Sequence, residues 1–177
     1  FRATTGSVAS SPAIRDGVVY ATTKAGELLA VGLDGTFLWN ATIAPTIASP
    51  AVSEAFVVVG DGLFGTGGSL RAFRPTGEPV WTSPLSGPVS ASPTIAGSAV
   101  IAATNEPAGR VVAVDLETGT PAWSLVLEPE EYILSSPVVH GSTLFVASDN
   151  GLLYALREPW SGAWGSDVVL IVVASAA

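Results

Sequence analysis

Short runs of apolar, mostly β-branched residues alternate with turn residues along the whole chain. The segment over residues 111–123 shows the pattern, with a VVAV run, a Glu-Thr-Gly turn and a closing tryptophan. The same frame recurs over residues 30–39 and 72–81. Its glycines and its tryptophans are each 42 residues apart, at Gly35, Gly77 and Gly119 and at Trp39, Trp81 and Trp123. A fixed period of this length indicates repeated structural units.

A Ser-Pro pair marks the start of each unit, at Ser11-Pro12, Ser49-Pro50, Ser92-Pro93 and Ser136-Pro137. A short first strand is expected directly after each pair. The second strands are expected at Val18–Thr22, Phe56–Val59, Ala99–Ala103 and Thr143–Ala147. The third strands are expected at Leu28–Val31, Leu70–Phe73, Val111–Val114 and Leu152–Leu156, and the tryptophan strand ends each unit.

Four short antiparallel strands in a repeat of about 42 residues are typical of a β-propeller blade. The sequence therefore predicts an all-β fold, a partial or small propeller of four blades over residues 1–164. The blade bounds are expected at about 11–39, 48–81, 91–123 and 135–164.

The units differ in length mainly between their second and third strands. The extra residues lie in Asp61–Ser69 and Thr104–Gly109. Insertions confined to one connection place variable loops on one rim, where repeat proteins commonly bind partners. We expect these loops and Glu128–Tyr132 to form the interaction surface, with contacts from Asp61, Phe64, Asn105, Glu128, Glu130 and Glu131.

The repeat frame decays at both ends of the chain. Phe1 occupies the tryptophan position ten residues before Ser11, and the turn before Trp164 reads REPWSGA. Residues 165–177 are expected to begin or complete a further blade. Alternatively, the apolar strand Val168–Ala177 pairs with a partner and mediates self-association. These ends, together with the missing Met and leader, suggest a processed form or a section of a longer array.

Composition excludes several classes of function. The net charge of −8 argues against nucleic-acid binding, which needs a basic surface. The absence of cysteine removes disulfides, thiolate metal sites and cysteine nucleophiles. No apolar run approaches the roughly 20 residues of a membrane-spanning helix.

The phrase AVDLETGTPAW, residues 113–123, fits the A-x-D-x-x-T-G-x-x-x-W pattern of pyrroloquinoline-quinone (PQQ) type propeller repeats. Residues 135–156 fit the remainder of such a repeat, so the chain resembles the PQQ-like propeller family. The resemblance implies that the tryptophans pack between neighbouring blades, at Trp39, Trp81, Trp123 and Trp164. The family contains quinone-dependent dehydrogenases and cofactor-free scaffolds, such as the lipoprotein that assists outer-membrane protein assembly. It implies an extracytoplasmic location.

No motif carries a calcium ligand or a catalytic acid of the dehydrogenases onto this chain. The Gly60–Gly65 stretch matches G-x-G-x-x-G, but a strand pattern follows instead of the helix that a dinucleotide site needs. His140 lies at a turn without a second histidine, and the three glutamates lack a recognisable calcium spacing. The sequence therefore assigns no catalytic residue, no cofactor and no metal site.

The function that this pattern favours is a non-catalytic scaffold that binds protein partners. One alternative is a structural subunit of an extracellular assembly or filament, joined through the C-terminal strand. A second alternative is a fragment of a PQQ-dependent dehydrogenase.

Overall fold

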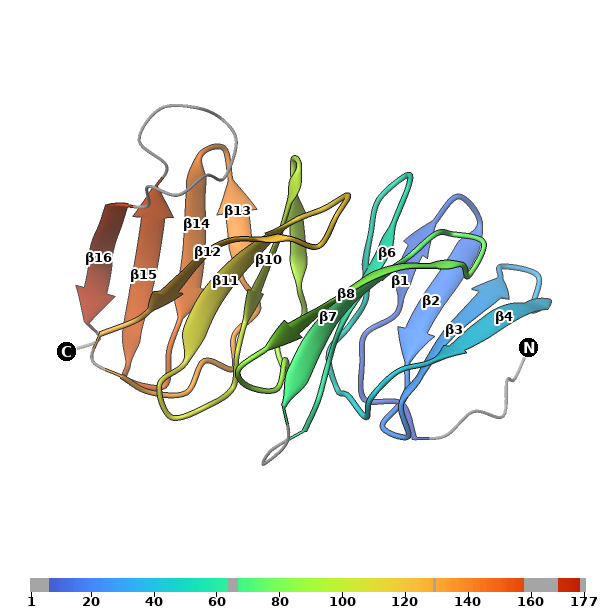
Figure 1. Ribbon diagram of the computed structural model, residues 1–177, viewed down its shortest axis with the longest axis horizontal. Helices are drawn as coiled ribbons and strands as arrows, with labels where there is room; N and C mark the ends of the chain where they lie inside the picture. The colour runs from blue at the N-terminus through green and yellow to red at the C-terminus, as the bar shows by residue number, and fades with distance from the viewer. Residues whose placement is uncertain (1–6, 64–66, 129, 158–168, 176–177) are drawn as a thin grey trace.

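The protein folds into four antiparallel sheets of four strands each, placed side by side in an arc (Figure 1). The computed structural model describes residues 7–63, 67–128, 130–157 and 169–175, and every regular element in these ranges is a β-strand. Each sheet is one propeller blade and contains four strands that are consecutive in the sequence. In blade 4, residues 158–168 between β15 and β16 lie outside the described ranges. The all-β propeller fold predicted from the sequence is confirmed.

The strand bounds follow the repeat. Blade 1 contains β1 (Ala13–Arg15), β2 (Val18–Thr22), β3 (Glu27–Gly32) and β4 (Phe37–Thr42). Blade 2 contains β5 (Ala51–Val52), β6 (Val57–Asp61), β7 (Gly68–Phe73) and β8 (Pro79–Leu85). Blade 3 contains β9 (Thr94–Ala96), β10 (Ala99–Ala103), β11 (Arg110–Asp115) and β12 (Pro121–Val126). Blade 4 contains β13 (Val138–His140), β14 (Thr143–Ala147), β15 (Leu152–Arg157) and β16 (Val169–Ser175).

The hydrophobic core lies between the sheets, in three seams. Alternate residues of a strand point to opposite faces, so a blade with neighbours on both sides needs apolar residues at every position. In β6, Val57 and Val59 enter the seam with blade 1, whereas Val58 enters the seam with blade 3. This is why β6 and β10 are apolar almost throughout and buried at all five positions.

The first strands of the blades lie next to one another, with β5 beside β1 and β9 and with β13 beside β9. These strands therefore form the inner side of the arc, and β4, β8, β12 and β16 form the outer edges. Blades 1 and 4 lie at opposite ends of the molecule (Figure 1).

The meander of strands gives the arc two rims. We call the rim with the β1–β2 and β3–β4 turns, and their equivalents, the turn rim. We call the rim with the β2–β3 hairpins and the connections between blades the loop rim. Hydrogen bonds join its parts: the Val89 N–H donates to the Asp61 carbonyl at 3.1 Å, and the Gly109 N–H donates to the Glu131 carbonyl at 3.2 Å.

The C-terminal strand differs from the sequence expectation. Instead of beginning a further blade, β16 pairs with β15 along its whole length, from Arg157↔Val169 to Leu152↔Ser175. It is thus the fourth strand of blade 4, the place that the repeat frame assigned to the segment ending at Trp164. An antiparallel partner for β15 needs only an apolar β-forming run, and VVLIVVAS provides one where the REPWSGA segment does not. Trp164 itself and Phe1 lie outside the described residues.

Candidate functional site: blade seams and loop rim

Trp39 closes the seam between blades 1 and 2 at the turn rim. Its Nε1–H donates to the Pro75 carbonyl of the β7–β8 turn at 2.8 Å. The indole lies between Tyr20 of its own blade and Phe73 of the next, with ring centroids 5.9 Å and 6.5 Å away. Gly77 touches the indole face: a Cβ built there would lie 2.8 Å from the ring, and φ is +93°. The turn therefore needs glycine for two separate reasons.

Trp81 repeats this arrangement between blades 2 and 3. Its Nε1–H donates to the Leu116 carbonyl at 2.9 Å, and a Cβ on Gly119 would lie 2.6 Å from the ring. Trp123 is half-buried and packs against the core cluster of blades 3 and 4. The constant spacing of glycine and tryptophan thus corresponds to a contact between one blade and the turn of the next.

The serines of the Ser-Pro pairs form a ladder across the seams. The Ser11 N–H donates to Ser49 Oγ at 2.8 Å, and the Ser49 N–H donates to Ser92 Oγ at 3.0 Å. The Ser92 N–H then donates to Ser136 Oγ at 3.0 Å. Blades 2 and 3 therefore each accept one bond from the preceding blade and donate one to the following blade. The sequence marked these serines but gave no sign of their role, because the bonds join separate repeats.

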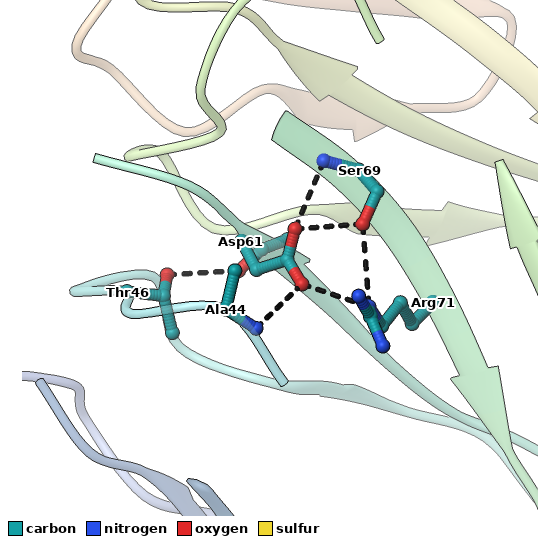
Figure 2. Close-up of polar contacts among 6 residues, drawn as sticks. Ala44, Thr46, Asp61, Ser69 and Arg71 are labelled. Atoms are coloured by element: carbon teal, nitrogen blue, oxygen red, sulfur yellow. Dashed lines mark hydrogen bonds and ion pairs between the residues drawn. The ribbon is translucent and has the colours of Figure 1, made fainter. Parts of the chain in front are cut away.

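A buried polar cluster around Asp61 holds the loop rim between blades 1 and 2 (Figure 2). Asp61 is 1% exposed. Its Oδ1 accepts from the N–H and the hydroxyl of Ser69 at 2.9 and 2.7 Å. Its Oδ2 accepts from the Ala44 N–H at 3.0 Å and from Arg71 Nε at 2.8 Å. Beside it, the Thr46 hydroxyl donates to the Gly60 carbonyl at 2.8 Å. One carboxylate therefore ties the β6–β7 hairpin to the connection from blade 1.

Sequence reasoning placed Asp61 in an interaction loop, but its carboxylate faces inward and its oxygens bond within the chain. A signal for this role was present in the repeat. The residue that ends or directly follows the second strand is polar and buried in all four blades: Thr23, Asp61, Thr104 and Ser148. A polar residue that recurs at a core position indicates a structural hydrogen bond.

The remaining expected contact residues differ in exposure. Asn105 is buried: its N–H donates to the Pro88 carbonyl at 2.7 Å, and its amide donates to Ser90 Oγ at 3.3 Å. Glu128 and Glu130 are exposed on the connection between blades 3 and 4, and Glu131 is half-buried. Phe64 lies outside the described residues. Of the expected set, Glu128 and Glu130 are the described residues that face solvent.

Apolar side chains on the same rim were not singled out from the sequence. Ile47, Leu63 and Leu134 are all exposed, and each comes from a different hairpin or connection of the loop rim. Their positions along the sequence follow no repeat, so the pattern alone gave no reason to select them. Together with the exposed glutamates they give this rim a mixed apolar and acidic surface.

The turn rim carries the acidic side chains with perturbed pKa values. Hydrogen bonds from the Thr118 side chain and backbone lower the pKa of Asp115, and bonds from Thr36 lower the pKa of Asp34. Burial is the main cause of a raised pKa at Tyr20. Both aspartates cap tight turns, so these shifts reflect turn geometry and not a proton-transfer site.

Two crevices open at the turn rim between neighbouring blades. The larger, about 450 Å³, lies between blades 2 and 3 and is lined by residues 53–56, Gly97, Ser98 and residues 115–117. The smaller, about 180 Å³, lies at the equivalent place between blades 1 and 2. In the described part of the chain, no three His, Cys, Asp or Glu residues are grouped to hold a metal ion, and no helix is suited to span a membrane.

The blades, their seams and their Trp-Gly contacts define a β-propeller of PQQ-like repeats. The family model described as outer membrane protein assembly factor BamB matches residues 33–158, and the chain belongs to this family.

Comparison with individual proteins agrees with this assignment. A protein from Burkholderia pseudomallei (strain K96243), named outer membrane protein assembly factor BamB, is 39% identical over 105 residues; the match covers 55% of this chain and 26% of that protein. The crystal structure of BamB from Moraxella catarrhalis superposes with a TM-score of 0.72 at 23% identity, covering 86% of this chain and 47% of that one.

A europium-containing methanol dehydrogenase has the same TM-score at 16% identity, covering 83% of this chain and 39% of that one. At this identity the likeness concerns the fold alone. The chain spans about a quarter of the curated relative and about half of the solved assembly factor.

Proposed function

We propose that this chain is a non-catalytic propeller scaffold that binds protein partners during outer-membrane protein assembly, outside the cytoplasm. The observation that carries the proposal is the family match over residues 33–158, together with a relative of the same name at 39% identity. The location outside the cytoplasm follows from the family alone.

The loop rim is the surface that best suits a protein partner. Ile47, Leu63 and Leu134 expose apolar area there, beside the acidic side chains of Glu128 and Glu130. Protein interfaces commonly combine an apolar centre with a polar rim. The polar side chains below this surface are bonded to the blades, so the loops are held in place before a partner arrives. A partner with an apolar patch bordered by basic side chains fits this rim.

The two alternatives receive less support. In the filament alternative, β16 would join a neighbouring subunit through its outer edge, since its other edge is paired with β15 over six residue pairs. A dehydrogenase would need a cofactor site, and the dehydrogenases of known structure share only the fold with this chain. A spectral change that saturates at one quinone per chain in the presence of calcium would support the dehydrogenase alternative instead.

The test compares retention of outer-membrane assembly proteins from a solubilised envelope fraction by three immobilised forms of the chain. These are the wild type, the triple variant Ile47→Ser, Leu63→Ser and Leu134→Ser on the loop rim, and the control Leu33→Ser, an exposed leucine on the turn rim. We expect the wild type and the control to retain the assembly proteins, and the triple variant to lose at least tenfold.

Thermal unfolding of all three forms establishes that the fold is intact. Equal retention by the triple variant and the wild type would place the binding surface elsewhere. Absence of any assembly protein from the wild-type eluate would refute the proposed function itself.

A further inference from the structure

The connection between blades 3 and 4 is longer than the two earlier connections and carries the exposed glutamates of the loop rim. Counted from the fourth strand to the Ser-Pro pair, it has nine residues, 127–135, whereas the connections 43–48 and 86–91 have six each. We call residues 127–135 the long connection; Glu128 and Glu130 face solvent from it. A longer connection has more conformations to lose, so more contacts are needed to hold it in one of them.

Both neighbouring hairpins hold the backbone of the long connection. On the blade 3 side, the Gly109 N–H donates to the Glu131 carbonyl at 3.2 Å, and a Cβ on Gly109 would lie 2.6 Å from that oxygen. On the blade 4 side, the Tyr132 carbonyl accepts from the Asp149 N–H at 3.0 Å and from the Ser148 hydroxyl at 3.2 Å. These contacts fix the second half of the connection.

The first half of the long connection is held by the side chain of Tyr154, in β15. The Tyr154 hydroxyl donates to the Glu128 carbonyl at 2.9 Å and accepts from the Asn150 side-chain amide at 2.6 Å. Tyr154 is 0% exposed, and its ring packs in the core cluster of blades 3 and 4. The place of Glu128 on the surface is therefore tied to a side chain in the core of the seam.

The strand position of Tyr154 is filled differently in the other blades. Its equivalents, which also directly precede the recurring alanine of the third strand, are Leu29, Arg71 and Val112. Leu29 and Val112 are buried apolar residues, and Arg71 pairs with Asp61. A phenylalanine would supply the same ring to the core, and a buried hydroxyl is costly unless it is bonded. The distinct contribution of the tyrosine is thus its bond to the long connection.

We infer that Tyr154 is a positioning residue for partner binding. Its hydroxyl holds Glu128, and with it the acidic stretch of the long connection, in the arrangement that a protein partner with basic side chains meets. A loop that is ordered before the partner arrives loses less conformational entropy on binding. The binding part of this inference rests on the proposed function, whereas the positioning of the connection does not.

The first measurement is the rate at which glutamyl endopeptidase cleaves the folded chain after Glu130 and Glu131. Tyr154→Phe removes the hydroxyl and keeps the ring, so we expect cleavage at these two sites to be at least tenfold faster than in the wild type. Cleavage after Glu54, in the β5–β6 turn of blade 2, should keep its rate. The matched control is Tyr20→Phe, which removes the hydroxyl of a buried tyrosine in blade 1 and should leave all three rates unchanged.

The second measurement is retention of outer-membrane assembly proteins by the immobilised chain. We expect Tyr154→Phe to retain at least threefold less than the wild type, and Tyr20→Phe to retain as much. Val57→Ala, which weakens the seam between blades 1 and 2, should also retain as much as the wild type. An equal loss in Val57→Ala would mean that stability, and not the position of the connection, governs binding, and would overturn the inference.

The two measurements fail separately. Wild-type cleavage rates in Tyr154→Phe would overturn the inference whatever the retention. Faster cleavage with unchanged retention would overturn its binding part, while the proposed function would stand because the wild type still retains its partners. No retention by the wild type would refute the proposed function, and the cleavage rates would then decide the positioning role of Tyr154 by themselves.

Discussion

The interior blades and the end blades carry the same strand pattern but bury it differently. All five residues of β6 and β10 are buried, whereas only two of five are buried in each of β2 and β14. The strands differ in what lies beside them, since each blade face is buried by the next blade. Burial in this fold is therefore a property of the seam and not of the single blade. The loss of stability caused by a substitution should therefore depend on how many seams the residue belongs to and on which contacts hold each seam together.

The largest effect should come from disrupting the buried polar cluster around Asp61, between blades 1 and 2. Asp61→Ala leaves Arg71 without its ion-pair partner and removes the acceptors of the Ala44 and Ser69 N–H groups. We expect a loss of about 4 kcal/mol in the free energy of unfolding, because these groups stay buried without partners. Denaturant unfolding measures the loss.

Glu78→Ala is the control for Asp61→Ala, because it removes the same charge from an exposed side chain of blade 2. It should change the free energy of unfolding by less than about 0.5 kcal/mol. Similar losses in the two variants would mean that overall charge, and not the buried cluster, accounts for the effect.

A smaller effect should follow from disturbing the tryptophan contact between blades 2 and 3. Gly119→Ala places a methyl group against the Trp81 ring at a residue with φ of +70°, and should cost about 3 kcal/mol. Gly97→Ala has a similar φ of +59° but meets no atom within 4 Å, and should cost about 1 kcal/mol. Trp81 fluorescence should change in the first variant alone. If the two variants lose equal stability, the turn conformation and not the seam contact sets the cost.

The smallest effect compares one substitution at equivalent positions of an interior and an end blade. Val57→Ala should cost about 2 kcal/mol, because Val57 is fully enclosed between blades 1 and 2. Val19→Ala should cost well under about 1 kcal/mol, because Val19 is half-buried. Denaturant unfolding of both variants separates the cases. Equal losses in the two variants would contradict the difference drawn here.

Much of the fold could be predicted from the sequence, because the same residues recur at each seam and give the sequence a fixed period. The spacing of glycine and tryptophan reflects Trp39 on Gly77 and Trp81 on Gly119, and the second strands of blades 1, 3 and 4 have the predicted bounds. The fourth strand of blade 4 was misplaced because its pairing with β15 depends on apolar residues that lack the repeat markers.

The candidate site was less accessible to sequence reasoning. Asp61 next to Gly62 has the pattern of a turn, and only its long-range bonds to Ala44 and Arg71 show that it is buried. The exposed apolar residues of the loop rim follow no period, and exposure depends on tertiary packing. The repeat therefore located the loops but not the side chains within them that face solvent.

The most direct test of the seam account is to cross-link two serines of the ladder across an internal seam. The chain has no cysteine, so Ser49→Cys with Ser92→Cys introduces the only two thiols. We expect a short bismaleimide to link them within one chain, because the Ser49 N–H donates to Ser92 Oγ across the seam between blades 2 and 3. Ser11→Cys with Ser136→Cys is the control, because these serines belong to blades 1 and 4, which lie at opposite ends of the arc (Figure 1). A link within one chain in the control, or no product from the Ser49–Ser92 pair, would contradict the account.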